Sequence, residues 1–372
     1  MTATKVDKSA SELAPQTRIH QSEKASYPIS IVATVRNEAA SIVNFVESLL
    51  GQTLTPTEII IVDGASTDGT AAILHEYEAR GAIVVISQEC NIAQGRNLGI
   101  RRARHEFIAV TDAGCTVDPD WLRQIWLCFQ SSDKPDVVAG NFRFDCRTLF
   151  EEAVVLATFS LDRETSPRAG QSPSSRSVGF QKSAWAAAKG YPEWLYAAED
   201  ALLNIRLHQL GFRFKFCREA IVSWRPRSSW RALAKQRVNF ARGNGRVGIG
   251  TQGYSVNLRY HLAMLAPLIG SIVWPWLLPL TVVPIFVHVR RNLWSQAAKA
   301  AAVSGKARMR WRVLLVMEFV RLAGLWGFFR GRLDRLLDRS FAGNQMDWMG
   351  IASLDELADP LARRQDPTPR SQ

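Results

Sequence analysis

Acidic side chains follow several short apolar runs, at positions where a parallel sheet would gather them. Glu38 comes three residues after the first run, Ile29–Val35, while Asp63 follows the second run and Asp112 the fourth. In open α/β sheets, ligands bind at the carboxyl ends of the strands. The pattern therefore marks these acids as candidate ligand-binding residues.

Two of these acids suit different chemical roles. Asp63, in IIIVDGASTDGT, is placed to accept hydrogen bonds from a nucleobase or a ribose, although a turn or helix-start role is the structural alternative and Asp68 is the expected cap. Asp112, in FIAVTDAGC, ends an apolar strand, where a carboxylate is costly unless it binds something. A hard oxygen ligand at that position suits Mg²⁺ or Mn²⁺.

A third candidate segment is EDALLNIRLHQLG, which opens with Glu199 and Asp200. Acids in the first turn of a helix complement its dipole by about 0.3–1 kcal/mol, which is the structural alternative. An acid held after a turn can instead act as a general base toward an acceptor hydroxyl. Four aromatic residues precede it and either stack on a sugar ring or pack in the core: Trp185, Tyr191, Trp194 and Tyr196.

The elements that would position these residues alternate between strand and helix patterns. Short β-branched runs separated by helical stretches predict βαβ units and an α/β fold with a mostly parallel sheet. The predicted strands are 29–35, 58–62, 83–86 and 107–110, and the predicted helices include 38–50 and 93–103. Between about Phe150 and Phe180 the pattern fades into ETSPRAGQSPSSRS, which predicts a mobile loop and a candidate lid.

Positive charge is concentrated in the second half of the chain. The 372 residues carry a net charge of +12, with 47% hydrophobic and 22% charged residues, which excludes global disorder. Eleven Lys or Arg lie in 206–246 and twelve in 290–339, with few acids among them. Such segregation indicates a surface that faces phosphates, in nucleic acid, anionic lipid or a lipid-linked pyrophosphate.

Cysteine usage and the N-terminus bear on the compartment. The five cysteines show no CxxC spacing, which argues against a disulfide framework or a zinc site and favours a reducing compartment. The first 27 residues have no apolar core of the kind that a secretory signal needs, and their polar composition predicts a disordered segment.

An apolar stretch follows the basic region. Tyr260–Val289 contains no Asp, Glu, Lys or Arg and is longer than the roughly 20 residues that a membrane span needs. Its prolines argue against one straight helix, and the basic linker 290–312 and the basic tail after Arg330 belong in the cytoplasm. With a cytoplasmic catalytic domain, the stretch must enter and leave on the same side, so we expect a monotopic or hairpin attachment. A buried helix of a soluble domain is the alternative. The weaker stretch Val313–Phe329 fits a tilted interfacial helix.

Taken in order, several motifs resemble those of inverting family 2 glycosyltransferases, especially bacterial exopolysaccharide and cell-envelope enzymes. The resemblance covers about 29–246 and rests on TVRNEAASIVNFVESLLGQT, IIIVDGASTDGT, NIAQGRNLGI, TDAGC, SVGFQKSAWAAAKGYPEWLYAAED and QRVNFARGNGR. It implies a GT-A fold, a nucleotide-diphospho-sugar donor that is often UDP-linked, a divalent Mg²⁺ or Mn²⁺, and a glycan or lipid-linked acceptor.

The resemblance also implies roles for individual residues. Asp63 would contact the nucleoside, Asp112 the metal and the diphosphate, and Asp200 would be the catalytic base. The donor pocket would include Val35, Glu38 and Arg96. Acceptor or phosphate contacts would come from Glu199, Trp194, Arg237, Arg242 and Arg246.

Two positions depart from the family pattern. A second acid usually stands two residues after the metal-binding Asp, and here that residue is Gly114. Processive synthases carry Gln-x-x-Arg-Trp after the base, whereas this chain has Asn239 and Phe240 after Gln236. The second departure favours transfer of one sugar per encounter.

The resulting hypothesis is a glycosyltransferase domain at 28–255, a membrane-associated helical region at 256–340 and a tail at 341–372, located at the cytoplasmic face of the inner membrane. A sugar nucleotidyltransferase is one alternative, although the VRNEAAS segment lacks the glycine-rich loop common in that class. A non-enzymatic basic membrane-binding protein is the other. No nucleic-acid-binding motif is found, so nucleic acid is not an expected partner.

Overall fold

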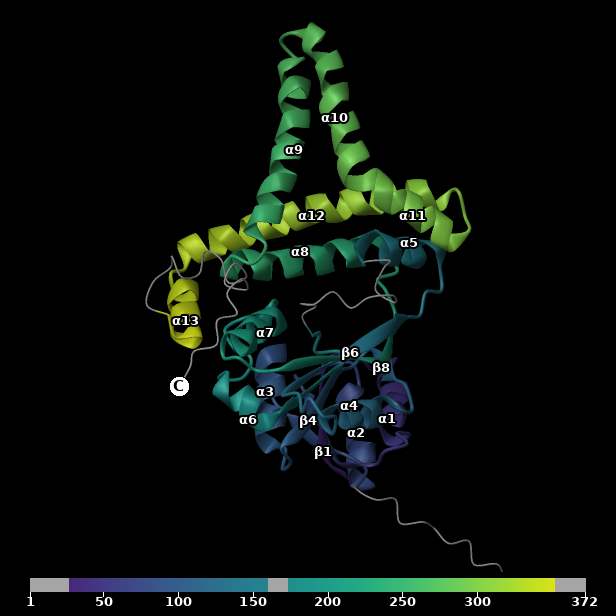
Figure 1. The fold of residues 1–372 in the computed structure, drawn as a ribbon, viewed down its shortest axis with the longest axis vertical. Helices are drawn as coiled ribbons and strands as arrows, with labels where there is room; N and C mark the ends of the chain where they lie inside the picture. The colour runs from purple at the N-terminus through teal and green to yellow at the C-terminus, as the bar shows by residue number, and fades with distance from the viewer. Residues whose placement is uncertain (1–26, 160–172, 352–372) are drawn as a thin grey trace, which may run out of the picture.

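The computed structural model describes residues 27–159 and 173–351, which form a mixed eight-stranded sheet flanked by helices and a helical region stacked against it (Figure 1). The strand order is β3-β2-β1-β4-β7-β6-β8-β5. The strands are β1 Tyr27–Val35, β2 Pro56–Asp63, β3 Val84–Ser87, β4 Phe107–Asp112, β5 Cys115–Val117, β6 Val137–Phe144, β7 Val178–Gln181 and β8 Phe214–Trp224.

The helices of the sheet domain connect these strands. They are α1 Ile42–Leu50, α2 Thr70–Ala79, α3 Ile92–Arg102, α4 Trp121–Phe129, α5 Leu149–Thr158, α6 Lys182–Ala187 and α7 Glu199–Gln209. The first four strands and the helices between them lie within a few residues of the predicted bounds. The predicted helix at 38–50 begins only at Ile42, because residues 36–41 form the loop that carries Glu38.

The parallel half of the sheet is β3-β2-β1-β4. Register brings Val35 beside Asp63 and Thr34 beside Asp112, so the carboxyl ends of these strands share one edge. Every residue of β1 after Pro28 is buried, because helices cover both faces of this part of the sheet. The expectation that the strand-end acids meet at one edge is confirmed.

The other half of the sheet is not parallel throughout. β7 runs antiparallel to both β4 and β6, and β5 runs antiparallel to β8. The alternation of strand and helix stops after Asp112, where β5 follows directly. The expected "mostly parallel" sheet is therefore a mixed one, parallel only up to β4 and for the β6–β8 pair.

A helical region covers the sheet domain on the side of α7. Its elements are α8 Trp230–Val247, α9 Thr251–Gly270, the 3₁₀ helix η1 Pro275–Thr281, α10 Val282–His288, the π-helical segment η2 Val289–Leu293, α11 Trp294–Ser304, α12 Met309–Leu337 and α13 Ser340–Met349. Figure 1 shows α8 and α12 side by side, with α9 and α10 standing away from them as a hairpin.

Glycines set the close approach of α8 and α12. An added Cβ on Gly331 would lie 2.0 Å from the Arg242 carbonyl oxygen, and one on Gly327 would lie 2.3 Å from the Val238 carbonyl oxygen. Any side chain there would push the two backbones apart. The long α12 thus packs closely along α8, the helix that follows β8 of the sheet.

The apolar stretch 260–289 forms the outer part of α9, η1 and α10, which we call the hairpin. None of the helices in the described ranges is both long enough and apolar enough to cross a membrane. The stretch 313–329 lies within the single helix α12. The expected tail from 341 begins inside α13, and the sheet begins at Tyr27, one residue before the expected domain start.

Two predictions fall largely outside the described residues. The disordered N-terminal segment at 1–27 overlaps them only at Tyr27, which belongs to β1. Of ETSPRAGQSPSSRS, only the last five residues are described. Helix α5 occupies Leu149–Thr158, where the sequence pattern had begun to fade.

Candidate active site

The loops after β1 and β2 are fastened to each other at the carboxyl edge of the sheet. Three consecutive backbone N–H groups of the first loop donate to side chains of the second. Asn37 donates to Ser66 Oγ (2.8 Å), Glu38 to Thr70 Oγ1 (2.9 Å) and Ala39 to Asp68 Oδ2 (3.0 Å). This network fixes the backbone around Val35 and Glu38 before any ligand binds.

Asp63 lies at the end of β2 and is 1% exposed. Its Oδ1 accepts hydrogen bonds from the Ser66 hydroxyl at 2.5 Å and from the Ser66 backbone N–H at 3.2 Å. Asp68 accepts from the Thr70 backbone N–H at 3.1 Å, but Gly69 occupies the N-cap position of α2, so Asp68 is not the helix cap that the sequence predicted. Asp63 therefore shapes the turn after β2, while its contact with a nucleoside stays a prediction.

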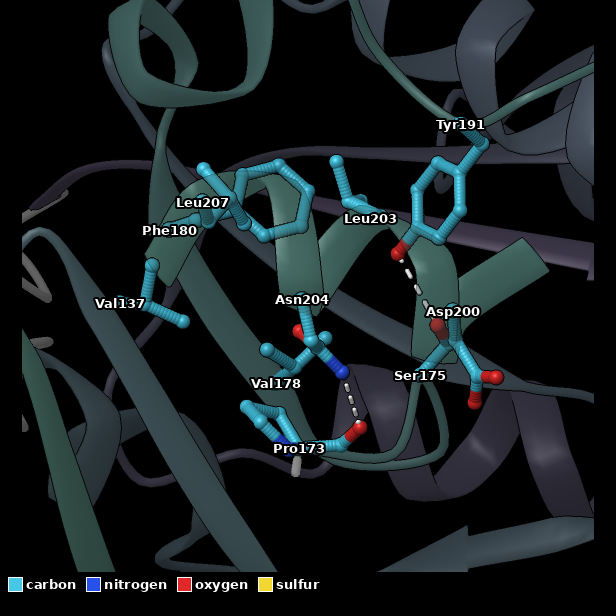
Figure 2. Close-up of a pocket in the computed structure, with 10 residues that line it drawn as sticks. All are labelled: Val137, Pro173, Ser175, Val178, Phe180, Tyr191, Asp200, Leu203, Asn204 and Leu207. Atoms are coloured by element: carbon cyan, nitrogen blue, oxygen red, sulfur yellow. Dashed lines mark hydrogen bonds between the residues drawn. The ribbon is translucent and has the colours of Figure 1, made fainter. Parts of the chain in front are cut away.

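Asp200 stands in the first turn of α7 and is half-buried. Its Oδ1 accepts from the Ala201 backbone N–H at 2.8 Å. Figure 2 shows Asp200 at one end of a small crevice whose other walls are mostly apolar, with Ser175 and Tyr191 beside it. Ala198, two residues before Asp200, has φ of +70°, a left-handed conformation that costs a non-glycine residue about 1–3 kcal/mol.

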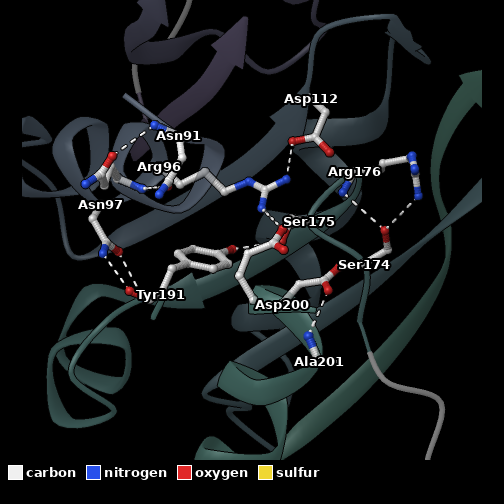
Figure 3. Close-up of polar contacts among 12 residues, drawn as sticks. Asn91, Arg96, Asn97, Asp112, Ser174, Ser175, Arg176, Tyr191, Asp200 and Ala201 are labelled. Atoms are coloured by element: carbon white, nitrogen blue, oxygen red, sulfur yellow. Dashed lines mark hydrogen bonds and ion pairs between the residues drawn. The ribbon is translucent and has the colours of Figure 1, made fainter. Parts of the chain in front are cut away.

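The strand-end acids and α7 are joined by one buried guanidinium. Arg96, on α3, is 2% exposed and donates to Asp112 Oδ1 at 2.6 Å and to Glu199 Oε1 at 2.7 Å (Figure 3). Its guanidinium also lies 5.2 Å from the centre of the Tyr191 ring. Arg96 was expected to line the donor pocket, and the structure places it beneath Asp112 as the link to Glu199.

This link leaves an excess of negative charge. Burial, followed by the nearby charge of Asp200, raises the pKa of Glu199 to about 7, while Arg96 opposes the rise. One guanidinium shared between two carboxylates does not offset both effects. The raised pKa of Glu199 thus reflects a buried place where carboxylates outnumber the guanidinium that they share.

Asp112 and Glu38 approach the place where the usual second acid is missing. Asp112 uses Oδ1 for Arg96, and no hydrogen bond to its Oδ2 is found among the described residues. A Cβ on Gly114 would lie 3.4 Å from Glu38 Oε1, so the Glu38 carboxylate occupies the space beside that position. Two carboxylates with a free oxygen, together with a diphosphate and waters, fit the oxygen-rich shell of Mg²⁺ or Mn²⁺.

The three candidate phosphate-binding arginines of α8 differ in their partners. Arg242 and Arg246 both bind Asp334 of α12, at 2.6 and 2.8 Å, so they hold the two helices together. Arg237 Nε is buried and has no hydrogen-bond partner among the described residues. Burial lowers the pKa of Arg237 to about 10, and the positive charge of Arg176 adds to the effect.

Arg176 was not among the residues singled out from the sequence. It lies near the end of ETSPRAGQSPSSRS, in the part that is described, and its guanidinium lies 4.5 Å from the centre of the Trp224 ring. Figure 3 draws it with Asp112 and Asp200. In the sequence it is one of two arginines in a Ser-rich stretch, which is too weak a signal to identify a site.

The aromatic residues before Asp200 divide as the packing alternative predicted. Trp185 and Tyr191 are buried core residues, and Tyr191 shares a hydrogen bond of 3.0 Å with Ser175. Tyr196 is 63% exposed. Trp194 packs near Phe341 of α13, and its buried Nε1 has no partner among the described residues. Tyr196 is thus the most exposed of the four, while Trp194 is partly buried, and a contact of either with an acceptor stays a prediction.

With this geometry in place, comparison with known proteins identifies the domain. Residues 30–172 match the model of glycosyl transferase family 2. The chain carries a family 2 glycosyltransferase domain. The family 2 domain contains β1 to β4, α1 to α3 and the acids at their ends, while α7 with Asp200 follows the matched segment.

Curated relatives agree with this assignment. The chain is 33% identical over 117 residues to glycosyltransferase GlyG of Streptococcus pneumoniae, covering 31% of this chain and 38% of GlyG. It is 25% identical over 228 residues to a poly-β-1,6-N-acetyl-D-glucosamine synthase of Staphylococcus epidermidis, covering 59% and 55%. The matches thus span little more than half, or less, of these relatives.

Among solved structures, the chain is similar to the mannosyltransferase PcManGT of Pyrobaculum calidifontis, which was determined in complex with GDP-Man and Mn²⁺. The TM-score is 0.51 at 17% identity, covering 80% of this chain and 87% of PcManGT. At this identity the similarity establishes the fold, a mixed GT-A-like sheet with flanking helices.

Proposed function

We propose that this protein is an inverting glycosyltransferase of exopolysaccharide or cell-envelope synthesis. It transfers one sugar from a nucleotide-diphospho-sugar, with UDP as the expected nucleotide, to a glycan precursor or a lipid-linked acceptor. The observation that carries the proposal is the Arg96 link, which joins Asp112 at the end of a family 2 strand to the helix turn that presents Asp200. The names of the relatives support a role in exopolysaccharide or cell-envelope synthesis, but they do not identify the sugar donor.

The proposed reaction is a single displacement. The acceptor hydroxyl oxygen attacks the anomeric carbon and forms the new glycosidic bond, while the bond from that carbon to the diphosphate oxygen breaks and the nucleoside diphosphate leaves with the electron pair. Asp200 takes the acceptor proton as general base. The absence of the Arg-Trp pair at Asn239 and Phe240 favours release after one transfer.

Asp112, with Glu38 beside Gly114, would hold a Mg²⁺ or Mn²⁺ ion, which when bound offsets charge on the diphosphate. Arg237 is the best protein cation for the same group, because it is desolvated and has no carboxylate partner within 27–159 and 173–351, unlike Arg242 and Arg246. A diphosphate would supply the missing charge. It belongs either to the donor or to a lipid-linked acceptor.

The test is thermal stability of the purified protein with UDP, GDP, dTDP or CDP, each with and without Mn²⁺. For one nucleotide, we expect the melting temperature to rise in the presence of the metal, which at saturating ligand corresponds to about 3 kcal/mol of stabilisation. Asp63→Ala or Asp112→Ala should abolish this rise. Asp118→Ala, an exposed-loop acid paired with Arg143, is the matched control. A response to salt and polyanions but to no nucleotide would favour the non-enzymatic alternative, and a response to nucleoside triphosphates would favour a nucleotidyltransferase.

We further propose that the hairpin attaches the protein to the cytoplasmic face of the inner membrane as a monotopic element. Its apolar side chains face outward, with Ile272 81%, Trp276 68% and Phe286 66% exposed. Contiguous exposure of this kind is rare in soluble proteins. The exposed cations Arg259, Arg290 and Arg291 form a collar at its base, where they can meet anionic head groups.

The length of the hairpin supports entry into one leaflet. From Arg259 to Gly270, α9 contains 12 residues, which rise about 18 Å, against a hydrocarbon core of about 30 Å. The tip, with Trp274 and Trp276, would therefore remain inside the bilayer. Both ends of the hairpin then lie on the side of the catalytic domain.

Flotation with vesicles that contain anionic lipid tests this attachment. The wild type should float with the vesicles, and Ile272→Asp with Trp276→Asp should remain in the soluble fraction. The pair Val43→Asp and Leu127→Asp, exposed apolar residues of α1 and α4, should float like the wild type. Equal flotation of all three proteins would contradict insertion of the hairpin.

A further inference from the structure

Three side chains able to bind a metal meet where the hairpin joins α12. His261 comes from α9, His288 ends α10 and Glu318 lies on α12. Their ligand atoms all lie within 4.8 Å of one another. His261 is 7% and His288 2% exposed, so this is a built, buried cluster on three separate elements. It is distinct from the site at Asp112.

A neutral His261 ring has too few N–H donors for the two acceptors that face it. Its Nδ1 lies 2.8 Å from the Asn257 carbonyl oxygen, and its Nε2 lies 2.6 Å from Glu318 Oε1. Both neighbours only accept hydrogen bonds when Glu318 is ionised, whereas a neutral imidazole has a single N–H. If Nδ1 donates to the carbonyl, Nε2 of the neutral ring presents a lone pair to a carboxylate, so a proton or a metal cation must lie between them.

The second histidine fits the same arrangement. His288 Nε2 lies 2.9 Å from Glu318 Oε2, and its Nδ1 lies 3.2 Å from the side-chain amide of Asn292. A carboxamide can present its oxygen as well as its nitrogen, so Asn292 can accept the Nδ1–H when Nε2 binds a cation. Metal-bound histidines commonly donate their other N–H to a carbonyl in this way.

We propose that His261, His288 and Glu318 form a structural site for one zinc-like divalent cation. Two imidazoles and a carboxylate suit Zn²⁺ or Co²⁺, whereas Mg²⁺ prefers oxygen ligands alone. Tetrahedral ligand atoms lie about 3.3 Å apart, so the 2.6 and 2.9 Å contacts with Glu318 must open by less than about 1 Å. Any pair at the limit of the 4.8 Å range must close by about 1.5 Å, and both changes are side-chain adjustments. The Glu318 side chain is 30% exposed, which leaves access for a fourth, solvent ligand.

The site would pin the hairpin to the rest of the protein. Apart from this cluster, the apolar hairpin stands clear of α12, as Figure 1 shows. Binding of one ion to α9, α10 and α12 together fixes the angle at which the hairpin projects. The inference does not depend on the catalytic proposal, since it concerns a different metal class at a different place.

The experiment uses the untagged full chain in detergent. Its metal content is measured after dialysis, and Co²⁺ loading is followed by visible absorption. We expect about one zinc per chain and intense tetrahedral Co²⁺ bands that Zn²⁺ abolishes and excess Mg²⁺ leaves unchanged. Absence of retained zinc together with a weak, octahedral Co²⁺ spectrum would overturn the proposal without any variant.

Variants locate the ion. His261→Ala with His288→Ala should lose the zinc and the cobalt bands. His75→Ala, which removes an exposed histidine paired with Glu78, and Asp112→Asn, which alters the oxygen site, should keep both the zinc and the cobalt bands. Zinc retention by the double histidine variant at the wild-type level would show that the ion binds elsewhere and would refute the assignment.

Discussion

The sheet domain and the hairpin use the same kinds of apolar side chain in opposite ways. In β1, the residues Ile29, Ile31 and Val32 are completely buried between helices. In the hairpin, Ile272 and Val273 are 81% and 68% exposed. An apolar surface turned outward over two helices and their connection is stable only against a partner that is itself apolar. The two regions thus differ in how they place apolar surface, and the proposed membrane attachment would cover the exposed surface of the hairpin.

Ionised groups show the reverse contrast. The sheet domain buries a carboxylate and its arginine at the heart of the candidate active site, where Arg96 and Glu199 are nearly inaccessible. The α8–α12 contact keeps Asp334 and its two arginines partly exposed. Buried charge is costly, and in the sheet domain the ion pairs of Arg96 with Asp112 and Glu199 compensate for that cost. If catalysis is confined to the sheet domain, substitutions of its buried charges should reduce activity and stability more than substitutions in the α8–α12 contact.

The largest effect is expected for Asp200→Asn. Loss of the general base should lower the transfer rate by about 10²- to 10⁴-fold, because the acceptor hydroxyl would have to lose its proton unaided. Nucleotide binding should be unchanged, since the strand-end residues are intact. Transfer rates and nucleotide-induced thermal shifts measure the two effects separately. Near wild-type transfer would mean that another group is the base.

The next largest effect is expected for Arg96→Met. The substitution leaves Asp112 and Glu199 without their shared cation, and a broken buried pair costs about 3–5 kcal/mol of unfolding free energy. Arg101→Met on the same helix removes an exposed ion pair with Glu193 and should cost less than about 1 kcal/mol. Denaturant unfolding of both variants measures the difference. Equal losses would remove the contrast between buried and exposed charge.

A smaller effect is expected in the helical region for Gly331→Ala. The new methyl would meet the Arg242 carbonyl and separate α8 from α12, at a cost of about 1–3 kcal/mol. Gly343→Ala in α13 meets open space and should be neutral or stabilising. Hydrogen exchange of α8 and α12 should rise in the first variant alone, while the sheet is unaffected. Exchange that rises equally in the sheet would show that the two regions unfold as one unit.

The sequence predicted the parallel half of the sheet closely, for a physical reason. Strands buried on both faces are continuous apolar runs, and the acids that end them interrupt the pattern at once, as at Asp63 and Asp112. The antiparallel half gave no such signal. β5 has three residues and β7 four, too short for periodicity, and their partners lie far away in the chain.

The candidate site was predictable in its members but not in its connections. Spacing placed Asp112 and Glu199 in separate motifs, 87 residues apart, and nothing in it indicated that Arg96 binds both. Similarly, the sequence did not distinguish Arg237 from Arg242 and Arg246. The structure does, because Arg242 and Arg246 bind Asp334 of α12. The roles of Val35, Glu38, Asp63 and the other site residues in binding stay predictions, since no ligand-bound state of this chain tests them.

The smallest predicted effect is the pH dependence that Glu199 contributes. Its folded pKa of about 7 lies above the ordinary value near 4.5, so the folded state binds the proton more tightly than the unfolded state. The resulting stability is fully present below pH 4.5 and is lost as pH rises through 7. Glu199→Gln is uncharged at every pH, and its unfolding free energy should therefore fall less than that of the wild type between pH 5 and pH 8.

Urea unfolding across this pH range measures the two slopes. Glu152→Gln, which alters the partly exposed partner of Lys306, should keep the wild-type slope. A wild-type slope in Glu199→Gln would mean that Arg96 holds Glu199 ionised throughout. In that case the negative charge at the site is greater than its raised pKa implies, and the electrostatic demand for a bound cation next to Asp112 becomes stronger.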